Sequence, residues 1–159
     1  MFRYVLRKKI MIRITKIFSF EAAHLLAEYN GPCKNIHGHS YLLHVTIKGE
    51  PIKDESNPHD GMVIEFSVLK NIVNEHIIHP FDHAIILPER ANKSLIKVIN
   101  EIENKVVYTP FQPTCENLLN SFAKLLIEHL PSNVSLCKLK LYETANSYAE
   151  WCESDQTGN

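Results

Sequence analysis

The sequence predicts an α+β protein in which two amphipathic helices cover one face of a four-stranded antiparallel sheet. Strand-like segments with alternating polar and apolar residues lie near both ends of the chain, and the two clearest helical segments lie between them. The order strand, strand, helix, helix, strand, strand is typical of an antiparallel sheet with helices on one side. The 159 residues, of which 45% are hydrophobic and 22% charged, suit one domain with its own core.

Two strands are expected in the first third of the chain. Residues 11–20 alternate apolar and polar side chains, with one slip at residues 16–17. A turn at residues 30–32, which read Asn-Gly-Pro, precedes the second strand, residues 38–49. This strand gathers its apolar side chains on one face, which is expected to point into the core: Tyr41, Leu43, Val45 and Ile47.

Two helices and a mixed segment follow a polar surface loop at residues 50–61. Residues 67–78 place apolar side chains at helical spacing, and Pro80 is expected to end this helix. A second helix is expected after Thr114, which is a suitable N-cap residue, and before Pro131. The segment between the helices is mixed and predicts one short helix and one short strand, residues 94–102 and 105–108.

Two strands close the chain. Residues 134–143 alternate with one slip at residues 137–138, and residues 147–151 form a short last strand after a turn. We expect a single domain over residues 11–153, with residues 1–10 as an N-terminal extension and residues 154–159 as a polar tail.

Composition excludes several classes of partner. The 17 Lys and Arg residues balance 18 Asp and Glu residues, so no nucleic acid is expected as a partner. No segment approaches the roughly 20 apolar residues that cross a membrane, and none has the apolar run of an export signal. The four cysteines are too few for a disulfide framework, so reduced thiols and a cytoplasmic location are expected.

Three histidines are candidate metal ligands. His37 and His39 lie two residues apart at the start of a strand, so their side chains share one face with about 7 Å between Cα atoms. His24 ends the preceding strand, which is expected to return antiparallel to it. Three imidazoles leave the fourth position of tetrahedral zinc open, as in catalytic sites. With Cys33 as a fourth ligand the site would be closed and structural, and spacing alone leaves both alternatives open, as well as the absence of a metal.

The Asp82-His83 pair adds catalytic groups. A carboxylate that orients an imidazole, and an imidazole that exchanges a proton with a thiol, are the components of a Cys-His-Asp relay. The alternative interpretation is a helix-terminal aspartate followed by a core histidine.

Six segments in this order resemble the 6-pyruvoyltetrahydropterin synthase family: residues 18–24, 33–39, 61–66, 82–83, 113–117 and 142–144. The three residues between Cys33 and the His-Gly-His motif are similar to the spacing in the bacterial 6-carboxytetrahydropterin synthases of queuosine biosynthesis. The resemblance implies the tunnelling fold, in which protomers of a homo-oligomer, a hexamer or tetramer, pair their sheet edges into a barrel with sites between subunits. It also implies conversion of 7,8-dihydroneopterin triphosphate to 6-carboxy-5,6,7,8-tetrahydropterin, with release of acetaldehyde and triphosphate.

The resemblance also assigns roles to individual positions. The zinc ligands correspond to His24, His37 and His39. The catalytic thiol and its two partners correspond to Cys33, Asp82 and His83. The residues that bind the pterin correspond to Glu143, which anchors it, and to Thr114 and Cys115, which line its pocket. A carboxylate suits the anchoring role because it accepts two hydrogen bonds from the amino group and ring N–H of a pterin.

This sequence departs from the family pattern at Glu65, where Asp is expected, at Phe81, where Leu is usual, and in residues 84–113, which are longer than typical. The cations that bind the triphosphate are not identified by the resemblance, and the candidates are Lys34, Arg90 and Lys93. Two other functions stay open: a sister activity on the same substrate, which is 6-pyruvoyltetrahydropterin formation or an aldolase-type cleavage, and a non-catalytic zinc-stabilised binding module.

Overall fold

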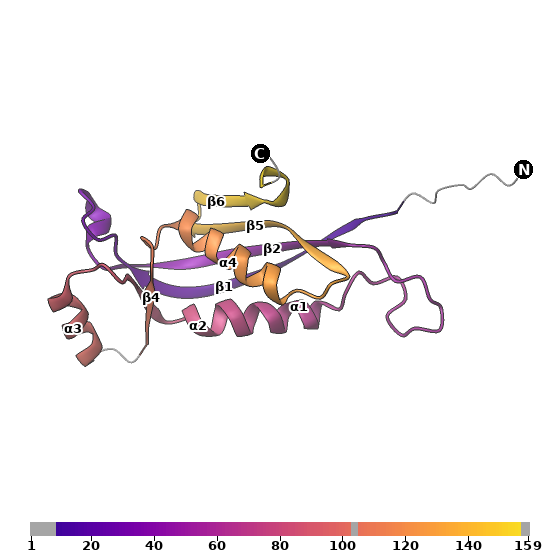
Figure 1. Cartoon of the computed structure of the whole chain (residues 1–159), viewed down its shortest axis with the longest axis horizontal. Coiled ribbons are helices and arrows are strands. Elements are labelled where there is room, and N and C mark those ends of the chain that lie inside the picture. Colours follow the sequence, from indigo (N-terminus) through magenta and orange to yellow (C-terminus); the bar gives the residue numbers. More distant parts are fainter. Residues whose placement is uncertain (1–8, 103–104, 157–159) are drawn as a thin grey trace, which may run out of the picture.

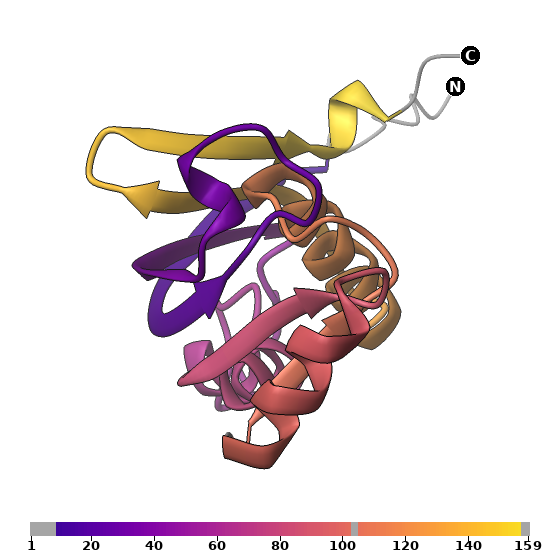
Figure 2. The same cartoon turned by 90° about the vertical axis from the view of Figure 1, so that its left-hand side faces the viewer.

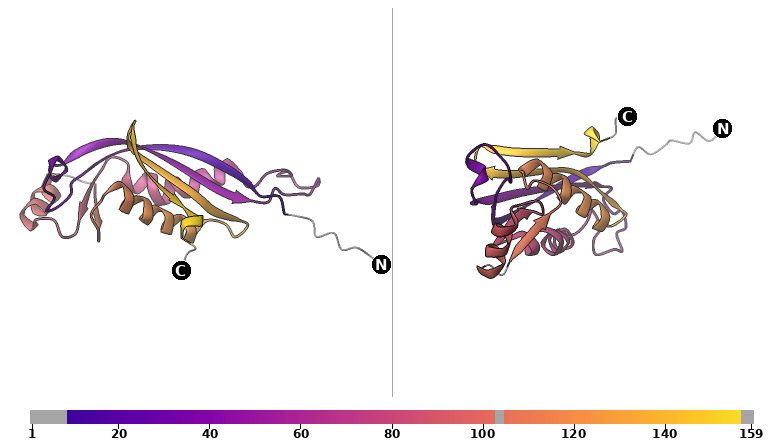
Figure 3. Two further views of the ribbon diagram at one scale, coloured as in Figure 1. Left: turned by 90° about the horizontal axis from the view of Figure 1, so that it is seen from above. Right: turned by 60° about the vertical axis from the view of Figure 1, so that its left-hand side comes forward.

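The computed structural model describes residues 9–102 and 105–156. Residues 1–8 of the predicted extension and residues 157–159 of the predicted tail lie outside this part. The described chain forms a curled sheet with the strand order β4-β3-β1-β2-β5-β6. The longest helical segments lie against one face of this sheet, and the opposite face is uncovered (Figures 1 and 3).

The long hairpin of β1 (Ile12–His24) and β2 (His37–Gly49) forms the centre of the sheet. Its antiparallel register runs without a shift from the Ile12–Gly49 pair to the His24–His37 pair. The predicted slip at residues 16–17 is therefore wrong. Lys16 continues the inward face, with its ammonium 5.9 Å from the ring centroids of both Phe18 and Phe66, whereas Ile17 points outward and is 55% exposed.

The C-terminal hairpin continues the sheet on the β2 side. Strand β5 (Val134–Thr144) pairs with β2, and β6 (Ser147–Cys152) pairs with β5, both antiparallel. The register shifts between Thr46 and Ile47, which leaves Cys137 as an extra residue on β5. This β-bulge confirms the slip that the sequence pattern predicts.

The prediction of four antiparallel strands is wrong, because two parallel strands extend the other side of the sheet. Strand β3 (Ala84–Pro88) pairs with β1, and β4 (Val106–Thr109) pairs with β3. The sequence does not predict β3, because its five residues are all apolar. Such a short run shows no alternation and fits a buried strand or a buried helix equally well. The short helix and strand expected in this segment are confirmed as α3 (Lys93–Ile102) and β4, each within one residue.

The first long helical segment does not stop at Pro80. It consists of α1 (Phe66–Val73), a π-helical turn (Asn74–Ile78) and α2 (His79–Phe81). Pro80 lies in the first turn of α2. Backbone N–H groups in a first turn have no acceptor within that turn, so the missing N–H of proline costs no hydrogen bond there. The segment ends one residue later, and Asp82 N still donates to the Ile78 carbonyl at 2.8 Å.

The second long helix, α4 (Cys115–His129), matches its prediction. Thr114 is the N-cap, and its Oγ1 accepts a hydrogen bond from Asn117 N at 3.3 Å. The helix ends at Leu130, before Pro131. Short 3-10 turns occur at Pro32–Lys34 and Glu153–Asp155, the latter at the start of the predicted tail.

The main core fills the space between the inward face of the central strands and helices α1 and α4. Its largest fully buried side chains include Phe20, Tyr41, Leu118 and Phe122, and the Phe20 and Tyr41 rings stack with centroids 4.9 Å apart. Truncation of such an aromatic side chain to alanine typically costs about 3–5 kcal/mol. A smaller cluster of Leu25, Leu87 and Ile99 attaches α3 to the sheet, at the end of the molecule where β1 ends (Figures 1 and 2). Among the described residues, no helix has the length and apolarity that crossing a membrane requires.

Candidate metal centre

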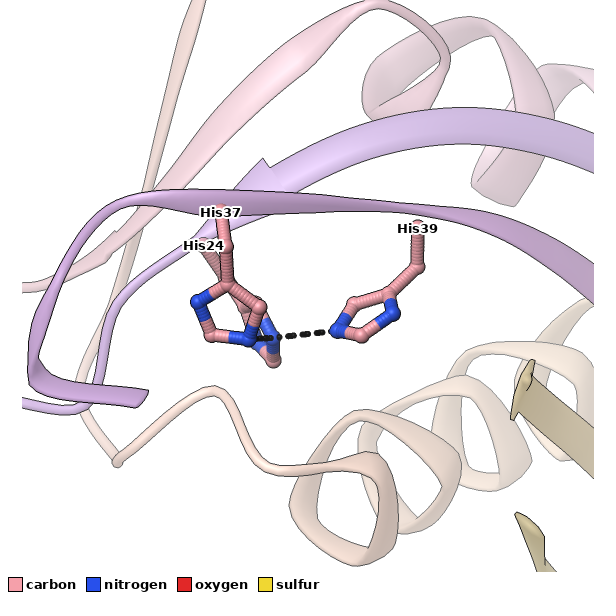
Figure 4. A group of neighbouring side chains, drawn as sticks. All are labelled: His24, His37 and His39. Atoms are coloured by element: carbon pink, nitrogen blue, oxygen red, sulfur yellow. Dashed lines mark hydrogen bonds between the residues drawn. The ribbon is translucent and has the colours of Figure 1, made fainter. Parts of the chain in front are cut away.

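The three predicted ligands converge where the central hairpin ends. His24 is the last residue of β1 and pairs in the sheet with His37, the first residue of β2, while His39 lies two residues further along β2. All three project to the helix-covered side, as Figure 4 shows. The His24 Nε2 atom lies 3.2 Å from Nε2 of His37 and 3.1 Å from Nε2 of His39.

Backbone carbonyls set the orientation of two of these rings. Nδ1 of His24 donates to the Pro113 carbonyl at 2.7 Å, and Nδ1 of His37 donates to the Asn35 carbonyl at 2.9 Å. A carbonyl only accepts, so each Nδ1 carries the proton and each Nε2 presents a lone pair. Two acceptors therefore face each other at 3.2 Å, an arrangement that a shared cation stabilises.

Burial favours the neutral form of His24 and His39. His24 is 3% exposed, and loss of solvent lowers its pKa to about 4, with smaller contributions from His37 and His39 and an opposing one from the Pro113 hydrogen bond. Burial also lowers the pKa of His39. Neutral imidazole is the form that binds a metal, and ligands 2.0–2.1 Å from a tetrahedral zinc lie about 3.3 Å apart. The observed separations fit such an ion, and in the described part of the chain this trio is the one group of His, Cys, Asp or Glu side chains suited to holding one.

Of the three predicted pterin-binding residues, Glu143 lies beside the cluster, and Thr114 and Cys115 lie at the start of α4. The Glu143 carboxylate lies 4.0 Å from His24 Nε2 and is 25% exposed, and burial raises its pKa, as does Glu116. The buried Cys115 donates its S–H to the Leu141 carbonyl at 3.1 Å. Thr114 uses its hydroxyl as the α4 cap. The Glu143 carboxylate thus lies beside the three histidines without being one of the candidate metal ligands. From this position it can bind a small molecule that lies next to the metal centre.

Asp82 and His83 form a hydrogen-bonded pair in the turn between α2 and β3. Asp82 Oδ2 lies 3.0 Å from His83 Nδ1, and its Oδ1 accepts a hydrogen bond from Glu21 N at 2.9 Å. That backbone hydrogen bond is the main reason why the pKa of Asp82 is lowered. The backbone of His83 has φ 58°, a conformation uncommon for a residue with a side chain, and its N–H donates to Glu21 O at 2.6 Å.

The side chain of His83 is 78% exposed, so its interpretation as a core histidine is wrong. It lines a shallow depression of about 370 Å³ together with residues of β1 and β2, among them Glu21, Gly38 and Ser40. The pair therefore offers an imidazole to an incoming group, backed by an ionised carboxylate.

Cys33 lies in the short 3-10 turn that precedes β2 and is partly buried. Its sulfur does not belong to the group of candidate ligands, which favours the open three-histidine site over the closed one. Its carbonyl accepts a hydrogen bond from Leu26 N at 2.9 Å, which ties the turn to the end of β1. No hydrogen bond or ion pair within residues 9–102 and 105–156 connects Cys33 to Asp82 or His83.

Sequence reasoning missed the groups that orient the ligands. Pro113 and Asn35 act through their carbonyls, and a backbone carbonyl has no signature in a sequence. The Tyr41 ring packs beneath the cluster, with centroids 5.4 Å from His39 and 6.2 Å from His24. The alternation of positions 37, 39 and 41 along β2 is the signal that places this ring on the same face.

Solved structures share this fold. The chain aligns with the 6-pyruvoyl tetrahydropterin synthase of Plasmodium falciparum with a TM-score of 0.66 and 21% identity, over 89% of this chain and 96% of the other. The enzyme of the same name from Caenorhabditis elegans aligns with a TM-score of 0.63 and 22% identity, over 91% and 96%. The fold is therefore that of the pterin synthases.

Sequence comparison identifies the family. The profile described as 6-pyruvoyl tetrahydropterin synthase matches residues 13–154. The 6-carboxy-5,6,7,8-tetrahydropterin synthase of Haemophilus influenzae is 35% identical, over 90% of this chain and all of that protein. The enzyme of the same name from Rickettsia typhi is 33% identical, over 88% and 99%. The chain belongs to the 6-pyruvoyl tetrahydropterin synthase family and is an enzyme of that family.

Proposed function

We propose that the protein is a zinc-dependent lyase that converts 7,8-dihydroneopterin triphosphate and one water molecule to 6-carboxy-5,6,7,8-tetrahydropterin, acetaldehyde and triphosphate, in queuosine and 7-deazapurine biosynthesis. The observation that carries this proposal is the 35% identity to the Haemophilus influenzae enzyme over its whole length. The spacing of Cys33 and the His-Gly-His motif supports the same branch of the family.

His24, His37 and His39 hold the zinc ion in this proposal. The convergent Nε2 atoms, the lowered pKa of His24 and of His39, and the carbonyls behind two of the rings support that role. A zinc ion with three protein ligands supplies Lewis acidity to oxygen atoms of a bound substrate. The metal content of the purified protein tests this assignment directly.

Glu143 orients the substrate. Its carboxylate accepts hydrogen bonds from the amino group and ring N–H of the pterin, and its position 4.0 Å from His24 puts the ring next to the metal ligands. Thr114, the N-cap of α4, and Cys115, its first residue, are assigned to the wall of the pterin pocket in this proposal, and the electrostatic effect of Glu143 on the Cys115 thiol supports that assignment for Cys115.

Cys33 moves protons on the side chain of the substrate. As a thiolate it accepts a proton from the carbon that loses it, and the protonated thiol or a second acid returns a proton at the neighbouring carbon, so that no external oxidant is needed. Asp82 and His83 accept and return this proton, with the carboxylate stabilising the imidazolium. Because no hydrogen bond or ion pair connects Cys33 to this pair within the described chain, we place the relay between subunits of a homo-oligomer, a hexamer or tetramer formed by pairing of sheet edges.

The test is a product analysis. Zinc-loaded protein is incubated with 7,8-dihydroneopterin triphosphate, and the pterin and the two-carbon product are identified by mass spectrometry. We expect 6-carboxytetrahydropterin together with acetaldehyde. A 6-pyruvoyl or 6-hydroxymethyl pterin would assign one of the sister activities instead, and binding without any product would indicate a non-catalytic module.

A further inference from the structure

A second cavity, of about 330 Å³, is lined in part by Leu25, the residue that follows the candidate metal ligand His24. Its walls come from two segments far apart in the sequence: the loop that follows β1, and the turn between β3 and α3. Figure 1 shows both segments at the end of the sheet where β1 ends. Its lining includes the side chains of Leu25, Glu28, Lys34, Arg90 and Leu95.

The cavity combines an apolar floor with two cations. Leu25 is buried, and it packs in the small cluster beneath α3 together with Leu95. Lys34 and Arg90 are exposed, and neither forms an ion pair or a side-chain hydrogen bond within residues 9–102 and 105–156. Both cations are therefore available to an anionic ligand without breaking an existing interaction.

The start of α3 does not supply the anion site by its own amides. Asn92 Oδ1 accepts hydrogen bonds from Ser94 N at 2.8 Å and Leu95 N at 3.4 Å, so the helix is already capped. The positive charge of the cavity comes from the side chains of Lys34 and Arg90, and Glu28 is the one carboxylate among its lining residues.

Two residues that line the cavity are next in sequence to residues of the proposed active site. Leu25 follows the metal ligand His24, and Lys34 follows Cys33, with consecutive Cα atoms about 3.8 Å apart. A hydrogen bond from Leu26 N to Cys33 O closes this loop into one wall. The cavity and the candidate metal centre therefore share two chain segments, the end of β1 and the turn before β2.

We infer that this cavity is the subsite for the polyphosphate tail of the substrate, with Lys34 and Arg90 as its specificity-determining cations. The inference rests on the proposed function for the identity of the pterin head. Of the three cations that the sequence offers, Lys93 does not line the cavity. Arg90 lies in the segment 84–113 that is longer than typical for the family, so part of this subsite is particular to this chain.

Binding of two oxidised, unreactive analogues tests the subsite without turnover. The zinc-loaded protein is titrated with neopterin and with neopterin triphosphate, and the pterin fluorescence gives a Kd for each. Substitution of both cations (K34A/R90A) should weaken binding of the triphosphate roughly 10–100-fold and leave the Kd of neopterin unchanged. Lys97→Ala is the matched control, because Lys97 lies on α3 outside the cavity lining and should change neither Kd.

A charge-removing variant of the opposite sign completes the test. Glu28→Gln removes the negative charge of the cavity and should tighten binding of neopterin triphosphate by roughly 2–5-fold, with no effect on neopterin. Equal weakening of both pterins by K34A/R90A, or no weakening of the triphosphate, would overturn the inference. These binding measurements do not depend on turnover. If the protein forms no carboxypterin but K34A/R90A selectively loses affinity for neopterin triphosphate, the proposed function is refuted and the subsite is still supported.

Discussion

The histidine cluster and the Asp82-His83 turn both attach to the end of β1, yet the fold holds them in opposite ways. His24 is 3% exposed, and its ring is oriented by a carbonyl on the neighbouring chain segment. His83 is 78% exposed, at a backbone φ of 58°, and it is held by hydrogen bonds to the backbone of Glu21. The buried group is preorganised for a ligand that stays bound, whereas the exposed pair is accessible to a group that arrives from outside.

Removal of a metal ligand should have the largest effect. His39→Ala leaves only two imidazole ligands, which are too few to retain zinc. Both zinc content and turnover should therefore be lost. His44→Ala is the matched control, because His44 lies on the same strand but alternates to the other face. Zinc content by atomic emission measures the difference, and retention of zinc by His39→Ala would contradict the assignment.

Replacement of the thiol should separate chemistry from metal binding. Cys33→Ala should lower kcat by about 10²–10⁴-fold, the range of a proton-transfer group, with one zinc per chain retained. Turnover and zinc content are measured on the same sample. Loss of zinc would instead favour the closed structural site with Cys33 as a ligand.

The exposed pair should affect turnover without affecting the metal. Asp82→Asn removes the negative charge beside His83 Nδ1 and keeps an oxygen that accepts from Glu21 N. We expect kcat to fall by about 10²-fold, with zinc content and thermal unfolding close to those of the parent protein. Mixing this variant with Cys33→Ala tests the intersubunit relay, because mixed oligomers should recover activity only if each site combines residues of two chains.

The carboxylate beside the cluster should act on substrate affinity. Glu143→Gln keeps the shape of the side chain but loses its charge and one acceptor, which typically costs about 1.5–3 kcal/mol. The KM for 7,8-dihydroneopterin triphosphate should rise roughly 10–100-fold. An unchanged KM with a lower kcat would reassign Glu143 to the chemistry.

The two cysteines of the site should differ in reactivity, which is the smallest expected effect. Burial raises the pKa of Cys115 to about 11, so its thiol stays protonated in the folded protein well above pH 9. The buried neutral thiol therefore contributes to stability at neutral pH, and this contribution is lost as the pH rises towards 11. At pH 8.5 iodoacetamide should modify the partly buried Cys33 and leave Cys115 unmodified. Peptide mapping reads the result, with urea-unfolded protein as the control in which both react.

Local patterns predicted the parts of the site that belong to one element. The two-residue spacing of His37 and His39 on a strand puts both on one face, a cap residue predicts the start of α4 at Thr114, and a slip in alternation predicts the bulge at Cys137. The expected antiparallel return of the first strand added His24 to the pair, and the structure brings its ring to them. These features follow from periodicities of 2 and 3.6 residues, which the sequence by itself determines.

Contacts between distant segments were decided by the tertiary structure alone. The Pro113 carbonyl orients His24, although the two residues are 89 positions apart in the sequence. Strand β3 joins the sheet as a parallel partner of β1. The first helical segment continues through a π-helical turn and does not stop at Pro80. The meeting of Lys34 and Arg90 at one cavity is of the same kind. Local periodicity reports which face a side chain occupies, but the partner opposite that face depends on how the whole chain packs.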